Sequence, residues 1–247
     1  MNFTNKNVVI TGGSKGIGFA TAKAFISAGA QVWITGRNAD SLKKAETEIN
    51  NPNLKTIVSD TSDLKSIAVL EKTVSADGNK IDVLFLNAGI ASFASIEQAT
   101  EAEFDAQFNT NVKGVYFTLQ QLLPHIANGG AVIFTSSTNA TAAALGSSIY
   151  AATKSALNKI AQVAANELAE RNIRVNIISP GPTQTPGLEN AVPAEAKEYL
   201  ASITAMQRLG KPEEIAKTVL FIASEKASFI TGTEIIVDGG VTNFMLK

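Results

Sequence analysis

Short apolar runs rich in Val and Ile recur along the chain, separated by longer stretches with a helical spacing of apolar residues. The runs are nearly continuous and do not alternate with polar residues, which is typical of strands buried on both faces of a sheet. We expect strands at 8–11, 31–35, 55–59, 83–87, 131–136, 174–179 and 234–237. We expect helices at 16–28, 39–50, 63–76, 101–125, 149–170 and 212–223. This alternation predicts an α/β fold with a doubly wound parallel sheet and helices on both faces.

Five residues with candidate chemistry stand where predicted strands end. In an open α/β sheet, ligands bind beyond the carboxyl ends of the strands, at the point where the strand order reverses. Because each of the five residues closes a different strand, we expect them to share one site. They are Gly12, Asp60, Asn87, Ser137 and Pro180.

A glycine cluster lies between the first predicted strand and the first predicted helix. Its spacing, Gly-x3-Gly-x-Gly, differs from the G-x-G-x-x-G of the usual dinucleotide fingerprint. A glycine turn before a helix directs backbone N–H groups and the helix dipole at an anion. An ordinary strand–helix turn is the alternative, but this context favours nucleotide binding. The loop residues that we expect to contact the cofactor are Gly12, Ser14, Lys15, Gly16, Ile17 and Gly18.

Tyr150 and Lys154 stand four residues apart in a predicted helix, and Ser137 lies thirteen residues before Tyr150. Four residues make about one helical turn, so the phenol and the ammonium share a face. A nearby ammonium favours the phenolate and lowers the pKa of a Tyr, which is otherwise about 10. A surface Tyr and Lys on an amphipathic helix is the alternative. Alongside the glycine loop, we interpret the pair as a proton donor and acceptor for work near neutral pH.

Six motifs can be set in one order: Thr11-Gly12-x3-Gly16-x-Gly18, Asn87-Ala88-Gly89, Asn111, Ser137, Tyr150-x3-Lys154 and Pro180-Gly181. In this order and spacing they resemble the classical short-chain dehydrogenase/reductase family, from Lys6 to about Gly240. The chain departs from the family at Leu86, where a second Asn often stands. The resemblance implies a single-domain Rossmann fold whose seven strands follow the order 3-2-1-4-5-6-7. It also implies reversible hydride transfer between a nicotinamide ring and a carbonyl carbon.

The resemblance implies roles for four catalytic residues. Tyr150 would be the general acid in reduction and the base in oxidation, and Ser137 would hydrogen-bond the same substrate oxygen. Lys154 would hold down the pKa of Tyr150 and bind the nicotinamide ribose. Asn111 would distort its helix and hold a water that relays protons; a locally bonded polar residue is the alternative. Ser136 is the rival of Ser137, but the spacing selects Ser137 and leaves Ser136 facing away.

Further residues would hold other parts of the cofactor. By resemblance, the segment from Asn87 to Gly89 would contact the adenosine ribose and Thr185 the nicotinamide carboxamide. Asp60 would meet the adenine amino group, although a loop carboxylate that caps the next helix is nearly as good an interpretation. These cofactor residues are Asp60, Asn87, Ala88, Gly89, Tyr150, Lys154, Pro180, Gly181 and Thr185.

The end of the second predicted strand bears on which nicotinamide cofactor binds. An NAD site carries a carboxylate there for the ribose 2′-hydroxyl, whereas an NADP site carries a cation for the 2′-phosphate. Gly36 stands at the carboxylate position and Arg37 follows it, while Lys15 in the glycine loop adds a second cation. We therefore predict NADP(H), with NAD(H) as the second choice.

Composition narrows the class of protein further. The 247 residues carry 21 basic and 22 acidic side chains, so the chain lacks the excess of basic charge that binds nucleic acid or an anionic membrane. The chain has no Cys and a single His, His125, so thiolate and multi-His metal centres are excluded. His125 is the one candidate base for a Ser–His triad, but we interpret it as a helix C-terminal residue. We expect one domain over 1–247, a substrate lid over 183–206 and a cytoplasmic location.

We predict an NADP-dependent carbonyl reductase or alcohol dehydrogenase for small organic molecules. A 3-oxoacyl-acyl-carrier-protein reductase is the alternative; Arg171 matches one carrier-docking position by resemblance, but Asn128 stands where such enzymes carry an Arg. A non-catalytic nucleotide-sensing regulator is a remote third. Apolar faces on 101–125 and 149–170, with the strand at 234–237, predict a homotetramer.

Overall fold

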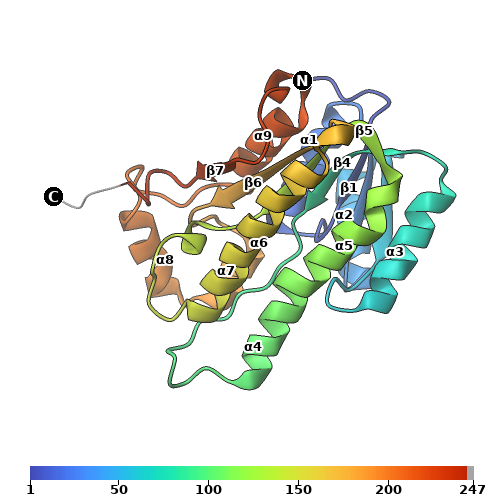
Figure 1. The fold of residues 1–247 in the computed structure, drawn as a ribbon. Coiled ribbons are helices and arrows are strands. Elements are labelled where there is room, and N and C mark those ends of the chain that lie inside the picture. Colours follow the sequence, from blue (N-terminus) through green and yellow to red (C-terminus); the bar gives the residue numbers. More distant parts are fainter. Residues whose placement is uncertain (244–247) are drawn as a thin grey trace.

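A single seven-stranded parallel sheet organises the protein. In a computed structural model of the chain, the structure describes residues 1–243 (Figure 1). The strand order is β3-β2-β1-β4-β5-β6-β7, as the resemblance implied, and every neighbouring pair is parallel. The strands are β1 (Asn7–Ile10), β2 (Gln31–Gly36), β3 (Leu54–Val58), β4 (Ile81–Leu86), β5 (Ile126–Thr135), β6 (Arg174–Pro180) and β7 (Glu234–Val237).

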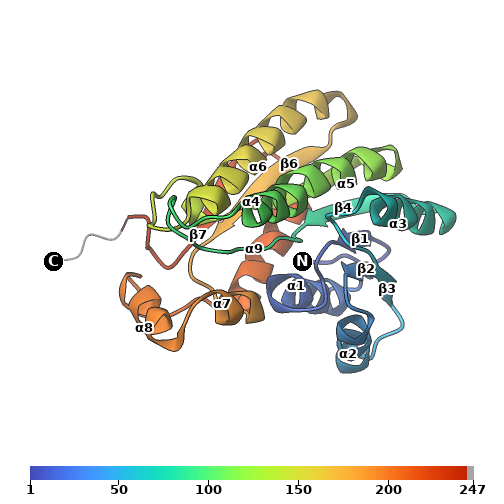
Figure 2. The ribbon, with the colours of Figure 1, turned by 90° about the horizontal axis from the view of Figure 1, so that it is seen from below.

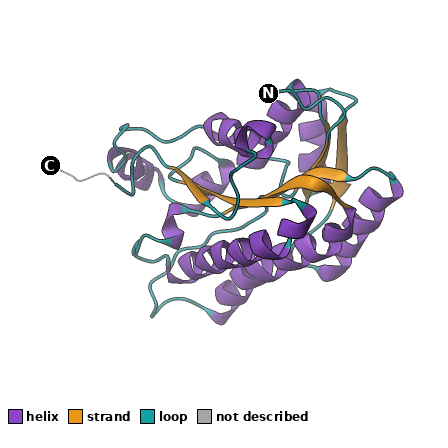
Figure 3. Ribbon diagram, turned by 45° about the horizontal axis from the view of Figure 1, so that its top comes forward, coloured by secondary structure: helices purple, strands orange, loops and turns teal. Residues whose placement is uncertain are grey.

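Helices cover both faces of the sheet (Figure 2; Figure 3). On one face α1, α2 and α9 bury Phe25, Leu42 and Val219, together with Ile10 and Ile34 of the strands. The other face is covered by α3, α5 and α6, which explains why the strands lack alternation: both of their faces are core. The α-helices are α1 (Gly16–Ser27), α2 (Ala39–Ile49), α3 (Leu64–Ala76), α4 (Glu101–Phe108), α5 (Val115–Leu122), α6 (Ser148–Glu167), α7 (Pro186–Ala191), α8 (Ala194–Ser202) and α9 (Pro212–Ala223).

The helix predicted over 101–125 is wrong in its continuity. A π-helical segment, Asn109–Gly114, separates α4 from α5, and a short 3-10 turn, Leu123–His125, ends the run. The π segment brings Gly114 so close to the loop after β3 that an added Cβ would lie 1.9 Å from the Thr61 carbonyl oxygen. Such a segment often marks a functional site, and this one contains Asn111.

Two other boundaries differ from the sequence pattern. β5 starts at Ile126, before the predicted 131, and a register irregularity between Ile81 and Val83 of β4 accommodates the extra residues. The region 183–206 contains two short helices, α7 and α8, in which the structure buries no residue. Without a buried face there is little apolar periodicity to detect, and the helices expected from the sequence therefore include none in this region.

Candidate active site

The candidate residues gather at the carboxyl edge of the sheet. Asn87 follows β4 directly, Gly12, Asp60 and Ser137 each come two residues after a strand, and Pro180 is the last residue of β6. Parallel strands put their carboxyl ends on one edge, so five loops distant in sequence converge there. The structure therefore places all five residues at one edge of the sheet.

The glycine loop is compact because side chains would not fit in it. Gly12 and Gly16 have φ values of +65° and +55°, in the region that favours glycine. An added Cβ would lie 2.9 Å from Ala88 Cα at Gly12, and 2.3 Å from the Gly12 carbonyl oxygen at Gly18. The backbone can therefore turn sharply into α1 and leave the helix N-terminus open to an anion.

Asn87 holds this loop against β4. Its side-chain Nδ2 donates to the carbonyl oxygens of Thr11 (3.2 Å) and Gly12 (3.1 Å). In return the Thr11 hydroxyl accepts from the backbone N–H groups of Asn87 and Ala88, both at 3.0 Å. These bonds give Asn87 and Thr11 a positioning role within the protein.

Tyr150, Ser137 and Lys154 lie together. Tyr150 stands in the first turn of α6, and its phenol is close enough to Ser137 for a hydrogen bond that lowers its pKa. The Lys154 ammonium is 5.7 Å from the centroid of the Tyr150 ring and donates to the Thr135 carbonyl oxygen at 2.8 Å. Lys154 is only 3% exposed, so this carbonyl is what satisfies its charge inside the protein.

The largest influence on the pKa of Tyr150 in this structure is burial, not Lys154. Burial raises the pKa of Tyr150 above 10.0, and the hydrogen bond with Ser137 opposes that shift only in part. Burial also lowers the pKa of Lys154 from 10.5 to about 8. Sequence spacing places the pair correctly but does not report desolvation, which dominates here.

Ser137 and Ser136 point in different directions, as the spacing predicted. The Ser136 hydroxyl is buried and donates to the Lys154 carbonyl oxygen at 3.3 Å, on the backbone of α6. Ser137 has extended backbone angles and its Oγ accepts from the Asn139 N–H at 3.2 Å, which leaves its hydroxyl hydrogen for another acceptor.

Asn111 is fully buried at the π segment and ties the site together. Its amide binds both backbone groups of Ile90, accepting from the N–H and donating to the C=O, each at 2.8 Å, and also donates to Thr153 Oγ1 at 3.1 Å. An added Cβ on Gly89 would lie 3.2 Å from Asn111 Oδ1 and 3.4 Å from Lys154 Nζ. A glycine at 89 thus keeps space open beside both side chains.

Asp60 and Thr185 have local partners. Asp60 Oδ1 accepts from the N–H and the hydroxyl of Ser62, both at 2.8 Å, and the N-cap of α3 is Asp63, so Asp60 is not the helix cap of the alternative interpretation. Thr185 caps α7 by accepting from the Leu188 N–H at 3.1 Å. Its side chain would lie 3.3 Å from a Cβ on Gly16, so the start of α7 lies against the glycine loop, as Figure 2 shows for α7 and α1.

Two exposed cations flank the end of β2. Lys15 is the N-cap residue of α1, and Arg37 directly follows β2. Both side chains are exposed, and within residues 1–243 neither forms an ion pair. Gly36 between them is buried, with Ser14 Oγ 3.1 Å from where its Cβ would stand.

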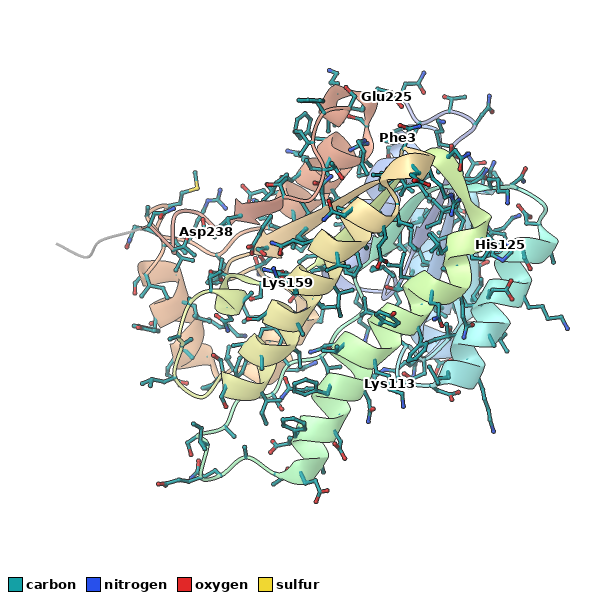
Figure 4. All side chains as sticks on the ribbon, viewed as in Figure 1. Phe3, Lys113, His125, Lys159, Glu225 and Asp238 are labelled. Carbon is teal, nitrogen blue, oxygen red and sulfur yellow. The ribbon has the colours of Figure 1, made fainter. Side chains whose placement is uncertain are left out.

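His125 takes no part in this site. It ends the 3-10 turn that follows α5, on the side of α3, where its Nε2 is 2.6 Å from Glu71 Oε1 (Figure 4). That position adjoins the first residue of β5, at the opposite edge of the sheet from Ser137, so the two form no triad. Over the described residues, no group of three or more His, Cys, Asp or Glu side chains is arranged to hold a metal ion, and none of the helices there is long and apolar enough to span a bilayer.

Comparisons with known proteins agree with this geometry. The sequence profile described as Enoyl-(Acyl carrier protein) reductase matches residues 12–242. The chain is 38% identical to the 3-oxoacyl-acyl-carrier-protein reductase FabG of Thermotoga maritima over 247 residues, 98% of this chain and 99% of the relative. The chain belongs to the classical short-chain dehydrogenase/reductase family. Within that family it is also 34% identical to the 2,3-dihydro-2,3-dihydroxybenzoate dehydrogenase of Escherichia coli over 254 residues, 98% of this chain and 99% of the relative.

Solved structures of the short-chain dehydrogenase/reductase family have the same fold. A short-chain dehydrogenase from Burkholderia cenocepacia, crystallised in complex with NADP, is 32% identical, covers 98% of this chain over its own full length and has a TM-score of 0.92. A short-chain dehydrogenase/reductase from Serratia marcescens has the same TM-score at 30% identity, with 98% and 100% coverage. The fold and the oxidoreductase class of this chain rest on these similarities together.

Sequence reasoning missed three residues that support the site. Thr135 supplies the carbonyl that binds Lys154, Thr153 bonds Asn111, and the fully buried Gln107 binds Ser92. The first acts through its backbone, which leaves no trace in residue type. Gln107 stands four residues before Asn111, so a polar residue at helical spacing from a candidate was the available signal.

Proposed function

We propose that this protein is an NADP(H)-dependent reductase of small ketones and aldehydes, acting in reverse on secondary alcohols. The observation that carries the proposal is the convergence of Tyr150, Ser137 and Lys154 at the carboxyl edge of the sheet, next to a glycine loop. The same full set of polar groups argues against a non-catalytic nucleotide sensor, which would not need a proton donor.

Each side chain has a task that follows from its environment. When bound, the nicotinamide supplies or accepts a hydride at the carbonyl carbon. Tyr150 donates a proton to the oxygen, where negative charge develops during reduction, and takes it back in oxidation. Ser137 donates a hydrogen bond to the same oxygen. Because burial raises the pKa of Tyr150, the phenol carries its proton at neutral pH before the substrate binds.

The protein has the features that a dinucleotide needs. The tight glycine loop, with the N-terminus of α1, suits the pyrophosphate, and the space kept open by Gly89 suits the nicotinamide ribose beside Lys154. Pro180, Gly181 and Thr185 would line the nicotinamide side, while the segment from Asn87 to Gly89, with Asp60, would face the adenosine. Lys15 and Arg37 would bind the ribose 2′-phosphate, which favours NADP(H) over NAD(H).

Cofactor preference should change with two substitutions, Gly36→Asp and Arg37→Ser, made together. They remove a cation from the 2′-phosphate site and add an acceptor for a 2′-hydroxyl. We expect the ratio of kcat/KM with NADPH to that with NADH to fall by about a hundredfold, since two charged contacts change. The Asp Cβ would lie 3.1 Å from Ser14 Oγ, so a second variant adds Ser14→Gly to relieve that contact. Higher kcat/KM with NADH in the unmodified enzyme would contradict this assignment.

A 3-oxoacyl-acyl-carrier-protein reductase is the second candidate, because the relative in Thermotoga maritima bears that name. The local structure favours free substrates instead. Arg171 donates from Nε to Asn128 Oδ1 at 3.1 Å, from Nη1 to the Leu123 carbonyl at 3.0 Å, and from Nη2 to the Ile126 carbonyl. Its guanidinium is therefore occupied within the protein and is a weak candidate for docking an acidic carrier.

A screen of NADPH oxidation tests the proposal and separates the two candidates. The panel holds ketones, oxoacyl thioesters, sugars and steroids, and one oxoacyl group is offered both on carrier protein and as a short free thioester. We expect turnover of free ketones and less than a threefold preference for the carrier-bound group. A large preference for the carrier-bound form would make carrier reduction the function. No turnover anywhere in the panel would contradict both.

We further propose that residues 183–206 cover the substrate. Near one end of this segment the Gln184 N–H donates to the Gly210 carbonyl at 2.8 Å, and at the other end the Met206 N–H donates to the Gly239 carbonyl at 3.2 Å. A lid held at both ends excludes water from the carbonyl as it reacts.

We also propose a homotetramer built on a single-domain chain of residues 1–247. Phe104, Tyr116 and Val163 on α4, α5 and α6 are about half exposed, and so is Ile236 on β7. Exposed apolar side chains on helices and on an edge strand are suited to symmetric contacts.

A further inference from the structure

The loop after β4 is held by two side-chain amides from one helical face. Asn111 binds the N–H and C=O of Ile90, as described above. One turn earlier, Gln107 does the same for Ser92: its Oε1 accepts from the Ser92 N–H at 3.4 Å, and its Nε2 donates to the Ser92 carbonyl at 3.3 Å and hydroxyl at 2.9 Å. Gln107 thus binds the backbone of Ser92 in the same way that Asn111 binds the backbone of Ile90, two residues earlier in the loop.

What Gln107 holds in place is the neighbour of Ser92, Phe93. The Phe93 ring packs edge-on against the Tyr150 ring, with centroids 5.8 Å apart and an angle of 70° between the planes. On its other side, the Ala94 N–H donates to the Gly146 carbonyl at 2.9 Å. Phe93 is therefore fixed from both flanks, by a side-chain amide before it and a backbone bond after it.

Gln107 and Phe93 differ in how exposed they are to solvent. Gln107 is 1% exposed, so its polar groups have no access to water, whereas Phe93 is 39% exposed despite its contact with Tyr150. A large aromatic ring that is partly open and rests on the proton donor offers a flat apolar surface next to the reacting oxygen. An aromatic substituent on the substrate can stack on such a ring or meet its edge.

We infer that Phe93 is a specificity-determining residue that favours ketones with a planar aromatic substituent, and that Gln107 is the positioning residue that sets the place of Phe93 through Ser92. The inference rests on the proposed function, since it presupposes a carbonyl substrate at Tyr150. A displaced Phe93 would lose the stacking surface without removing any catalytic group, so it should change the choice of substrate more than the ability to turn over.

The test compares acetophenone with butanone as substrates, using kcat/KM with NADPH. In Phe93→Ala we expect the ratio of acetophenone to butanone to fall about tenfold, and in Gln107→Met about threefold or more. Ser92→Ala keeps two of the three Gln107 bonds and serves as a milder variant if Gln107→Met folds poorly; its ratio should fall less, in the same direction. Gln31→Met, at the amino end of β2, where the exposed side-chain amide donates to Asn53 Oδ1, is the control, and its ratio should stay unchanged.

A ratio of two substrates does not depend on the fraction of folded enzyme, so a loss of stability alone cannot move it. In the Phe93→Ala background, Gln107→Met should leave the ratio unchanged, because the residue through which it acts is gone. An unchanged ratio in Gln107→Met and Ser92→Ala, or an undiminished effect in the Phe93→Ala background, would overturn the inference. So would a wild-type enzyme that reduces other carbonyl compounds but not acetophenone; that result leaves the proposed function intact, whereas no carbonyl reduction at all would contradict the proposed function itself.

Discussion

Replacing Tyr150 with Phe should lower kcat/KM for ketone reduction by at least about a hundredfold while NADPH still binds. The substitution removes one hydroxyl, the proton donor, and keeps the ring that packs against Phe93. Binding of NADPH, followed by nicotinamide fluorescence, should stay within about threefold of wild type, because the glycine loop and Lys154 are untouched. Steady-state rates on the best ketone of the panel measure the loss.

The chain offers a matched control for this change. Tyr116 on α5 is half exposed and packs on Phe117, away from the site, so Tyr116→Phe should retain wild-type rates. Near-normal turnover in Tyr150→Phe would show that the proton comes from elsewhere, and the mechanism would be wrong.

Replacing Lys154 with Met should lower the activity of the enzyme and raise its stability. Turnover should fall by about a hundredfold or more, since the ammonium beside the nicotinamide ribose and Tyr150 is lost. Stability at pH 7 should rise by about 2 kcal/mol, because a buried charge is removed. Two contributions make up this value. The lowering of the Lys154 pKa from 10.5 to about 8 corresponds to a burial cost of roughly 3 kcal/mol, and loss of the hydrogen bond to the Thr135 carbonyl offsets roughly 1 kcal/mol of the gain.

The stability difference between Lys154→Met and wild type should depend on pH. Below pH 8, Lys154 is charged in both the folded and the unfolded chain, so its burial cost is fully present. Between about 8 and 10.5 the folded protein gives up its proton while the unfolded chain keeps it, so wild type gains stability and the advantage of Lys154→Met shrinks. Urea unfolding at pH 7 and pH 10 measures both values. Lys72→Met on α3, at an exposed position, should show no such difference, and a Lys154→Met protein less stable than wild type at pH 7 would contradict the burial argument.

The fold could be predicted from the sequence because two-sided burial leaves a clear trace. Both faces of the sheet are core, so strands such as β1 and β6 appear as apolar runs, and the resemblance supplied their order. The π segment at Asn109–Gly114 could not be located in the same way. It depends on the approach of Gly114 to Thr61, which lies fifty-three residues earlier in the chain, and helical periodicity reports only local spacing.

The positions of the site residues were predictable, but their energetics were not. The sequence spacing predicted that Ser137, Tyr150 and Lys154 lie together and that Ser136 points elsewhere. The raised pKa of Tyr150 and the lowered pKa of Lys154 come from desolvation, which depends on everything packed around the two groups. Arg171 is a second example. Its residue type suggested a cation that docks a carrier protein, but its guanidinium donates to three oxygen atoms of the protein and has a structural role.

Transfer of deuterium tests the central claim most directly, because it requires the cofactor, the substrate and the catalytic groups in one event. The enzyme is given NADPH that carries deuterium at the transferable position, with a ketone that the panel identifies, and the product is analysed by mass spectrometry and NMR. We predict one deuterium on the carbinol carbon of the secondary alcohol for each NADPH oxidised, with the rate of transfer at least about a hundredfold lower in Tyr150→Phe. Oxidation of NADPH without deuterium in the product, or transfer by Tyr150→Phe at the wild-type rate, would contradict the account.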